Sequence, residues 1–269
     1  MLAALRAVPL SLLSNLALVR QLSARELHAR YRGSFLGAAW LVLVPLLMLA
    51  VYTFVFTVVF PSRWKGGTGD KTEFAILMYS GLVVFGFFGE ILGRAPRLIV
   101  DHANYVKKVV FPLEALVWVM IGPAVFTLGV NLLILLAFIV LTGTLPPATV
   151  LLVPIYLTPL VLLSAGLAWL LASVGVFLRD LGQVIGVVVS ALMFVTPIFY
   201  PVSAVPPSMQ TLLHLNPLTY YVTACRSLTV TGDLPSATST ATAVAVAMAV
   251  AWIGSGWFRY SRHAFADVL

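Results

Sequence analysis

Two carboxylates, Glu90 and Glu114, lie at the ends of long apolar runs of this sequence. An ionisable group inside a membrane is a candidate for proton transfer, because its charge is costly to bury. Each glutamate is within about two helical turns of a polar boundary, where its side chain can reach water or a basic partner. We therefore expect these residues to pair with Arg94, Lys107 or Lys108, and we regard a proton relay as the weaker hypothesis.

No motif for nucleotide hydrolysis, metal binding or acyl transfer occurs in the sequence. It lacks the glycine-rich phosphate loop, the nucleophile elbow of hydrolases, and the closely spaced histidine and cysteine pairs of zinc sites. The histidines are scattered, and the single cysteine, Cys225, cannot form a disulfide within the chain. We therefore expect no catalytic residue, cofactor or metal on this chain, so uphill transport needs an ion gradient or a separate ATPase.

Aromatic side chains are dense in two of the apolar runs. Tyr52 and Phe56 belong to the first run, and Phe85, Phe87 and Phe88 belong to the second. Aromatic faces can stack on the apolar faces of sugar rings, but they also fill ordinary helix packing and interfacial belts. For any single residue, packing is the simpler interpretation.

The composition indicates that these side chains are held by membrane-spanning helices. Of the 269 residues, 61% are hydrophobic and only 9% are charged, against about 25% charged in soluble domains. We predict an all-α integral membrane protein with a segment 1–34 before the membrane and a transmembrane domain over 35–269. Barrel strands are shorter than these runs and alternate in polarity. The six predicted spans are 35–60, 74–93, 111–142, 149–178, 181–200 and 237–258, with bends at Pro45 and Pro123.

The distribution of basic residues predicts the orientation. With the N-terminus inside, twelve of the sixteen lysines and arginines fall in cytoplasmic segments, as the positive-inside rule requires. Both termini are therefore expected in the cytoplasm. The net charge of +7 suits anionic lipid headgroups, and we do not expect nucleic-acid binding, because no basic platform with interleaved aromatics is evident.

A short amphipathic helix is expected just before the first span, at 24–32. Ser23 and Glu26 have the spacing of a capping box, and Glu26 and Arg30 are four residues apart and can pair. Gly33 can take the left-handed conformation after the helix. Such a helix can lie on the membrane surface as a lipid anchor, or it can also dock a cytoplasmic partner, and the pattern does not decide between these roles.

The loop 94–110 is the longest cytoplasmic connection between the predicted spans. Pro96 can begin a short helix there, and the lysines near its end suit the helix dipole. A rigid helix at this place can transmit force between a partner and the membrane. A solvated basic turn that obeys the positive-inside rule is the simpler alternative.

On the outer side, the segment 202–230 is too apolar for a free loop and too broken for one span. It predicts two short helices joined at Asn216 and Pro217. Irregular backbone at membrane depth is tolerated only where protein or water covers it. The segment is therefore either a re-entrant hairpin that caps an exit or a pair of helices lying flat on the outer surface.

Six short motifs follow one another from about residue 20 to the end of the chain. They are RYRGSFLG at 30–37, leading into Trp40 and Pro45; Asn104 with Lys107, Lys108 and FPLE at 111–114; Arg179-Asp180; TPIFYP at 196–201; Asn216-Pro217; and FAD at 265–267. In this order they resemble the transmembrane subunit of polysaccharide-exporting ATP-binding-cassette (ABC) transporters, which include permeases for O-antigen, capsule and teichoic acid. Leu113 departs from the pattern, because a basic residue is expected there.

The resemblance implies a homodimer of six-span subunits bound to two copies of a nucleotide-binding ATPase, which would hold the ATP and Mg²⁺. The cargo would be a lipid-linked polysaccharide, with O-antigen first among the candidates, loaded from the cytoplasmic leaflet of a bacterial inner membrane. Other functions remain open. One is an ATP-driven permease for drugs or lipids, and another class comprises gradient-driven secondary transporters and scaffolds without transport.

The resemblance also implies roles for three groups of residues. The ATPase would dock on Arg25, Glu26, Arg30, Arg32, Asn104, Tyr105, Lys107, Lys108, Arg179 and Asp180. Aromatic position suggests that a channel between two subunits is lined by Tyr52, Phe56, Phe85, Phe87 and Phe88. An outer exit gate would contain Pro197, Tyr200, Pro201, Asn216, Pro217 and Tyr220.

Overall fold

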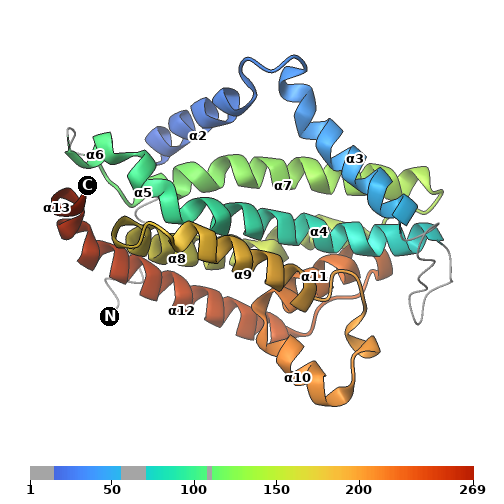
Figure 1. Cartoon of the computed structure of the whole chain (residues 1–269). Coiled ribbons are helices and arrows are strands. Elements are labelled where there is room, and N and C mark those ends of the chain that lie inside the picture. The colour runs from blue at the N-terminus through green and yellow to red at the C-terminus, as the bar shows by residue number, and fades with distance from the viewer. Residues whose placement is uncertain (1–14, 56–70, 108–110) are drawn as a thin grey trace.

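The computed structural model describes residues 15–55, 71–107 and 111–269, and within these ranges the chain is helical and contains no strand (Figure 1). The longer helices are α2 (Leu16–Tyr31), α3 (Trp40–Phe54), α4 (Lys71–Arg94), α7 (Ala115–Leu141), α8 (Val153–Phe177), α9 (Leu181–Val195) and α12 (Ala237–Ser261). The shorter ones are α5 (Leu98–Asp101), α6 (Ala103–Lys107), α10 (Pro207–Leu215), α11 (Pro217–Arg226) and α13 (Phe265–Val268). The predicted all-α class is confirmed.

Five helical segments among the described residues are long and apolar enough to cross a membrane. They are Gly37–Phe54, Thr72–Asp101, Ala115–Leu141, Ala148–Phe177 and Ala237–Val268. The predicted fifth span, 181–200, is shorter than expected, because α9 ends at Val195, just before Thr196 and Pro197. A residue that precedes proline is driven out of the helical region. The chain is a multi-pass membrane protein, and the count of six spans stays a prediction.

The bundle is built around α4 and α8, with α7, α9 and α12 along their sides (Figure 1). Close approach of α8 and α12 depends on two glycines, since a Cβ built on Gly254 would lie 2.0 Å from the carbonyl oxygen of Gly166. Small residues allow membrane helices to pack this closely. Trp169 is fully buried, and its ring meets Trp118 edge-on, with centroids 5.5 Å apart.

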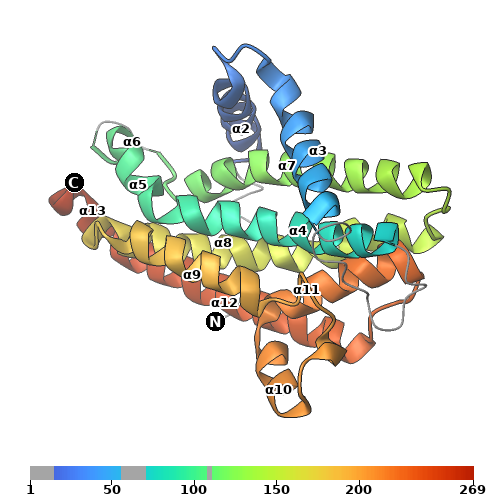
Figure 2. The ribbon, with the colours of Figure 1, turned by 45° about the vertical axis from the view of Figure 1, so that its right-hand side comes forward.

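Helices α2 and α3 lie outside this bundle, where they form a V on one side of α7 (Figures 1 and 2). Gly33 lies in the turn of the V with a φ of +86°, and the predicted left-handed residue after the interface helix is confirmed. Most apolar side chains of α3 are exposed, and Leu49 is the one buried residue assigned to the helix. The predicted first span reaches 60, and its residues 56–60 lie outside the described part.

Two expectations about local structure were wrong. The interface helix begins at Leu16 and not at 24, so Ser23 lies inside α2 and cannot form a capping box. The loop 94–110 does not hold one continuous helix, because η3 (Ala95–Arg97) continues into α5 and a break at His102 separates α5 from α6. The predicted pair of outer helices, joined at Asn216, is confirmed as α10 and α11.

Candidate functional site

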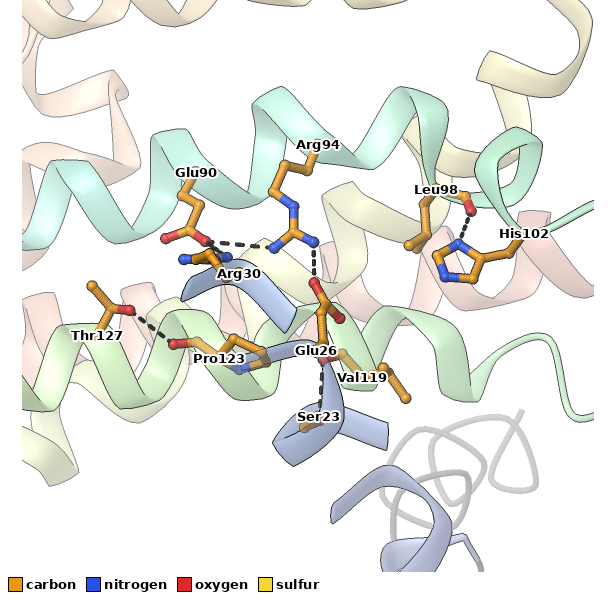
Figure 3. A network of polar contacts seen from close by, with 10 residues as sticks. All are labelled: Ser23, Glu26, Arg30, Glu90, Arg94, Leu98, His102, Val119, Pro123 and Thr127. Carbon is orange, nitrogen blue, oxygen red and sulfur yellow. Dashed lines mark hydrogen bonds and ion pairs between the residues drawn. The ribbon is translucent and has the colours of Figure 1, made fainter. Parts of the chain in front are cut away.

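A network of ion pairs joins α2 to the end of α4 (Figure 3). Arg30 Nη2 lies 2.5 Å from Glu90 Oε1, and Arg94 donates a hydrogen bond to Glu26. Arg94 Nη1 also lies 3.5 Å from Glu90 Oε1, an ion-pair distance without a hydrogen bond. Two acidic and two basic side chains from two helices therefore alternate in one cluster.

This arrangement changes the predicted partners of Glu26 and Arg30. Each was expected to pair with the other along one helix, but each is instead paired with α4. Burial lowers the pKa of Arg30, but the hydrogen bond and charge of Glu90 outweigh it and raise the pKa above its ordinary value. The expected pairing of Glu90 with Arg94 is confirmed.

A second contact fixes α2 against α7 (Figure 3). Ser23 Oγ donates a hydrogen bond to the carbonyl oxygen of Val119 at 3.1 Å. A Cβ built on Gly122 would lie 2.4 Å from Ser23 Oγ, so this glycine provides the space for the contact. Helix α2 is thus joined to two helices of the bundle and does not only rest on lipid.

Most of the other residues expected to dock an ATPase fall at the end of the bundle where α6, the α8–α9 turn and α13 lie (Figure 1), but Arg25 lies within α2 and Arg32 at its C-terminal end. Those with exposed side chains are Arg25, Arg32, Asn104, Lys107, Arg179 and Asp180. Tyr105 is half-buried, with its ring centroid 4.7 Å from that of Phe111, and Lys108 lies outside the described residues. The second glutamate, Glu114, pairs with Arg262 at 2.8 Å, a residue that was not among the predicted partners.

The candidate channel aromatics separate into two environments. Phe85, Phe87 and Phe88 are buried in the core of the single chain, so in this conformation they face other helices. Tyr52 is half-buried and borders a pocket beside α3. Phe56 lies outside the described residues.

Hydrogen bonds from side chains hold together the segment 196–230, which is predicted to lie on the outer side. Asn216 Nδ2 donates to Thr196 Oγ1 at 2.9 Å, and Asn216 Oδ1 accepts from the backbone N–H of Leu218 at 3.0 Å. The hydroxyl of Tyr200 donates to the carbonyl oxygen of Phe194 at 2.9 Å, and that of Tyr220 to Thr240 Oγ1 at 2.9 Å. Pro197, Pro201 and Pro217 lie in or next to these turns.

Arg226 has a structural role that was not predicted from the sequence. Its guanidinium is buried and donates to the carbonyl oxygens of Leu77, Pro197 and Ile198 at 2.7, 2.6 and 2.5 Å. Its position in an apolar stretch could have indicated this role, because a charge in such a stretch needs hydrogen-bond partners.

Comparison with known proteins finds a transporter family model and several export or transport proteins. A family model described as ABC-2 type transporter matches residues 17–230. The O-antigen export system permease protein RfbA of Myxococcus xanthus is 29% identical over 252 residues, which cover 93% of this chain and 94% of the relative. A Klebsiella pneumoniae protein of the same name is 24% identical over 213 residues, covering 78% of this chain and 79% of the relative. The polysialic acid transport protein KpsM of Escherichia coli is 20% identical over 251 residues, covering 91% and 94%.

Proposed function

Because the chain belongs to the ABC-2 type transporter family, we propose that it is the permease subunit of an ATP-driven exporter whose cargo is a polysaccharide. The relatives that align over most of both chains are named as O-antigen export and polysialic acid transport proteins. O-antigen is our first choice, because the relative with the highest identity among these carries that name. The polymer would be lipid-linked and would enter from the cytoplasmic leaflet of a bacterial inner membrane.

The observation that carries the proposal is the attachment of α2 to α4 through Arg30, Glu90, Arg94 and Glu26. A helix that rests only on lipid cannot transmit force to a span. Partly buried ion pairs, together with the Ser23–Val119 bond, make α2 move with α4 and α7. An ATPase that pushes on α2 would therefore act directly on two helices of the bundle.

The ATPase would be a separate subunit, because the sequence of this chain has no phosphate loop, and the family resemblance implies two copies of it. Its docking surface would combine α2 with the exposed side chains of Asn104, Lys107, Arg179 and Asp180. The ATP and Mg²⁺ would bind to that subunit. Two copies of the permease would pair within the membrane. Each would have six spans, with α9 as the fifth, and both termini in the cytoplasm.

On the outer side, α10 and α11 would form a re-entrant exit gate. Their short lengths of 9 and 10 residues are well below the roughly 20 residues of a full span. The side-chain bonds of Thr196, Asn216 and Arg226 cover the irregular backbone between them and α9, as membrane depth demands.

A drug or lipid permease is the closest alternative, because a family fold does not determine the cargo. A gradient-driven transporter or a scaffold is the alternative from another class, and independence from an ATPase would distinguish it. The test is deletion and complementation in the bacterium that carries the gene. Loss of surface polysaccharide on deletion, with polymer retained inside the cell and export restored by the wild-type gene, is the expected result. Unchanged surface polysaccharide would overturn the proposal.

A biochemical test examines the partner. The tagged chain should bring down a nucleotide-binding subunit and show ATP hydrolysis only in its presence. Transport by the purified chain without any ATPase, driven by an ion gradient, would instead support the secondary-transporter alternative.

A further inference from the structure

A pocket of about 360 Å³ lies between α3 on one side and α4 and α7 on the other. Its volume is near the lower end of the usual range for ligand pockets, roughly 300–1,000 Å³. The chain contributes three kinds of groups to its wall: apolar side chains, aromatic rings and one polar cluster. The residues important here are Trp40, Tyr52, Tyr79, Thr127 and Asn131.

The polar cluster joins α4 to α7. The hydroxyl of Tyr79 donates to Asn131 Oδ1 at 3.1 Å, and Asn131 Nδ2 donates to the carbonyl oxygen of Thr127 at 2.9 Å. Thr127 Oγ1 donates in turn to the carbonyl oxygen of Pro123 at 3.0 Å. Among the described residues, these bonds use one acceptor site and one N–H of the Asn131 amide, and Asn131 also lines the pocket.

The polar cluster lies in the middle of a helix that can span the membrane, where polar side chains are costly. Asn131 lies near the middle of α7, a helix of 27 residues that is long and apolar enough to span a membrane. If Asn131 served only to join α4 to α7, its amide would be expected to be fully enclosed by protein, because lipid hydrocarbon cannot form hydrogen bonds with it. Asn131 is instead only partly buried and borders a pocket. The site therefore suits a ligand that brings its own hydroxyl groups.

Aromatic rings supply the opposite wall. Trp40 and Tyr52 of α3 and Tyr31 at the end of α2 border the same pocket. Flat rings stack on the apolar faces of sugars, while amide and hydroxyl groups bond to the sugar hydroxyls. Rings on one wall and an amide–hydroxyl cluster on the other are complementary to a saccharide unit.

A second pocket on the other side of α7 gives an internal comparison. It has a volume of about 460 Å³ and is lined mainly by apolar residues such as Phe126, Leu133 and Leu136. Phe126 is 50% exposed and neighbours Thr127 in the sequence, but the two residues border different pockets. One helix therefore presents a pocket lined mainly by apolar residues on one side and, on the other side, a pocket that contains the Tyr79–Asn131 polar cluster.

We propose that the pocket between α3, α4 and α7 binds a saccharide unit of the exported polymer within a single subunit. This inference rests on the proposed polysaccharide cargo and moves the sugar contact away from Phe85, Phe87 and Phe88, which are buried in the core. Tyr79 and Asn131 bond the hydroxyl groups, and Trp40 and Tyr52 cover the faces of the ring.

Cysteine accessibility tests the proposal in the assembled transporter. The chain is well suited, because its one natural cysteine, Cys225, is buried at 1% exposure and should remain silent. Variants T127C and F126C would be treated in membranes with a charged, water-soluble thiol reagent. A thiol in hydrocarbon holds little thiolate, so T127C should react at least about tenfold faster than F126C.

Protection by cargo is the second part of the experiment. Labelling of T127C should slow in cells that make the polysaccharide, compared with cells that lack the glycosyltransferases for it. Equal rates for T127C and F126C, or no protection by the polymer, would overturn the inference. An N131L variant should lower export while complex assembly is retained, and full export by N131L would also contradict it.

These outcomes separate the inference from the proposed function. If deletion of the wild-type gene leaves surface polysaccharide intact, the cargo itself is wrong. If deletion abolishes export but T127C is unprotected, the cargo is right and the pocket is not its binding site.

Discussion

Arg226 Nη1 donates a hydrogen bond to the carbonyl oxygen of Pro197 at 2.6 Å, which joins α11 to the turn that ends α9. The same guanidinium reaches Ile198 in that turn and Leu77 of α4. Gly81 leaves space for it, since a Cβ there would lie 3.1 Å from Arg226 Nη2. One side chain thus holds α11, α4 and the turn after α9 together.

Replacing this arginine should loosen the outer segment. R226A leaves buried carbonyls without their donor, at a cost of about 1–3 kcal/mol for each such group. R226K keeps the charge but cannot donate to three divergent oxygens at once. We expect the thermal midpoint of the purified protein to decrease in the order wild type, R226K, R226A. Equal midpoints for wild type and R226A would show that the bonds do not stabilise the segment.

The ion-pair network predicts that Glu90 matters more for coupling than for stability. E90Q preserves the shape of the side chain and removes the charge shared by Arg30 and Arg94. Partly exposed pairs contribute only about 0.2–1 kcal/mol each, so the thermal midpoint should change little. Export per ATP hydrolysed should decrease, because E90Q weakens the Arg30–Glu90 link between α2 and α4 and leaves only the Arg94–Glu26 link intact.

The matched control is D233N, which neutralises an exposed carboxylate in the loop before α12. Its ratio of export to ATP hydrolysis should equal that of the wild type. An unchanged ratio for E90Q would contradict the role of the network in coupling.

Docking through α6 predicts a charge-dependent association. Lys107 is exposed at the end of this helix, so K107E should weaken retention of the ATPase subunit on the tagged permease, and more strongly at low salt, where charges are least screened. K107Q removes the charge without reversing it and should give an intermediate retention. Equal retention for wild type and K107E would exclude Lys107 from the interface.

Sequence alone predicted the elements of this fold better than the contacts between them. Apolar runs located the long helices, because the bilayer dictates their length and composition. The pair Asn216-Pro217 located the break between α10 and α11. The pattern at Ser23 and Glu26 was misleading, because both side chains are used in contacts with other helices. Local spacing cannot reveal a partner that lies 68 or 96 residues away.

Local sequence spacing also failed to reveal which residues of the candidate sites come together. Aromatic density marked Phe85, Phe87 and Phe88, but the face that a helical residue presents depends on which neighbours pack against it. The polar residues Tyr79 and Asn131 lie 52 positions apart and showed no common pattern. Their relation becomes visible only when α4 and α7 are placed side by side.

The packing of α8 against α12 gives the sharpest stability prediction. G254A places a methyl group 2.0 Å from the carbonyl oxygen of Gly166, and because this is backbone, no side chain can rotate away. Overpacking of this kind costs about 1–3 kcal/mol or more. G256A is the matched control on the same helix, since its Cβ meets nothing within 4 Å. We expect G254A to lower the yield of monodisperse protein and its thermal midpoint in detergent, while G256A leaves both unchanged. Equal behaviour of the two variants would mean that α8 and α12 are not packed this closely.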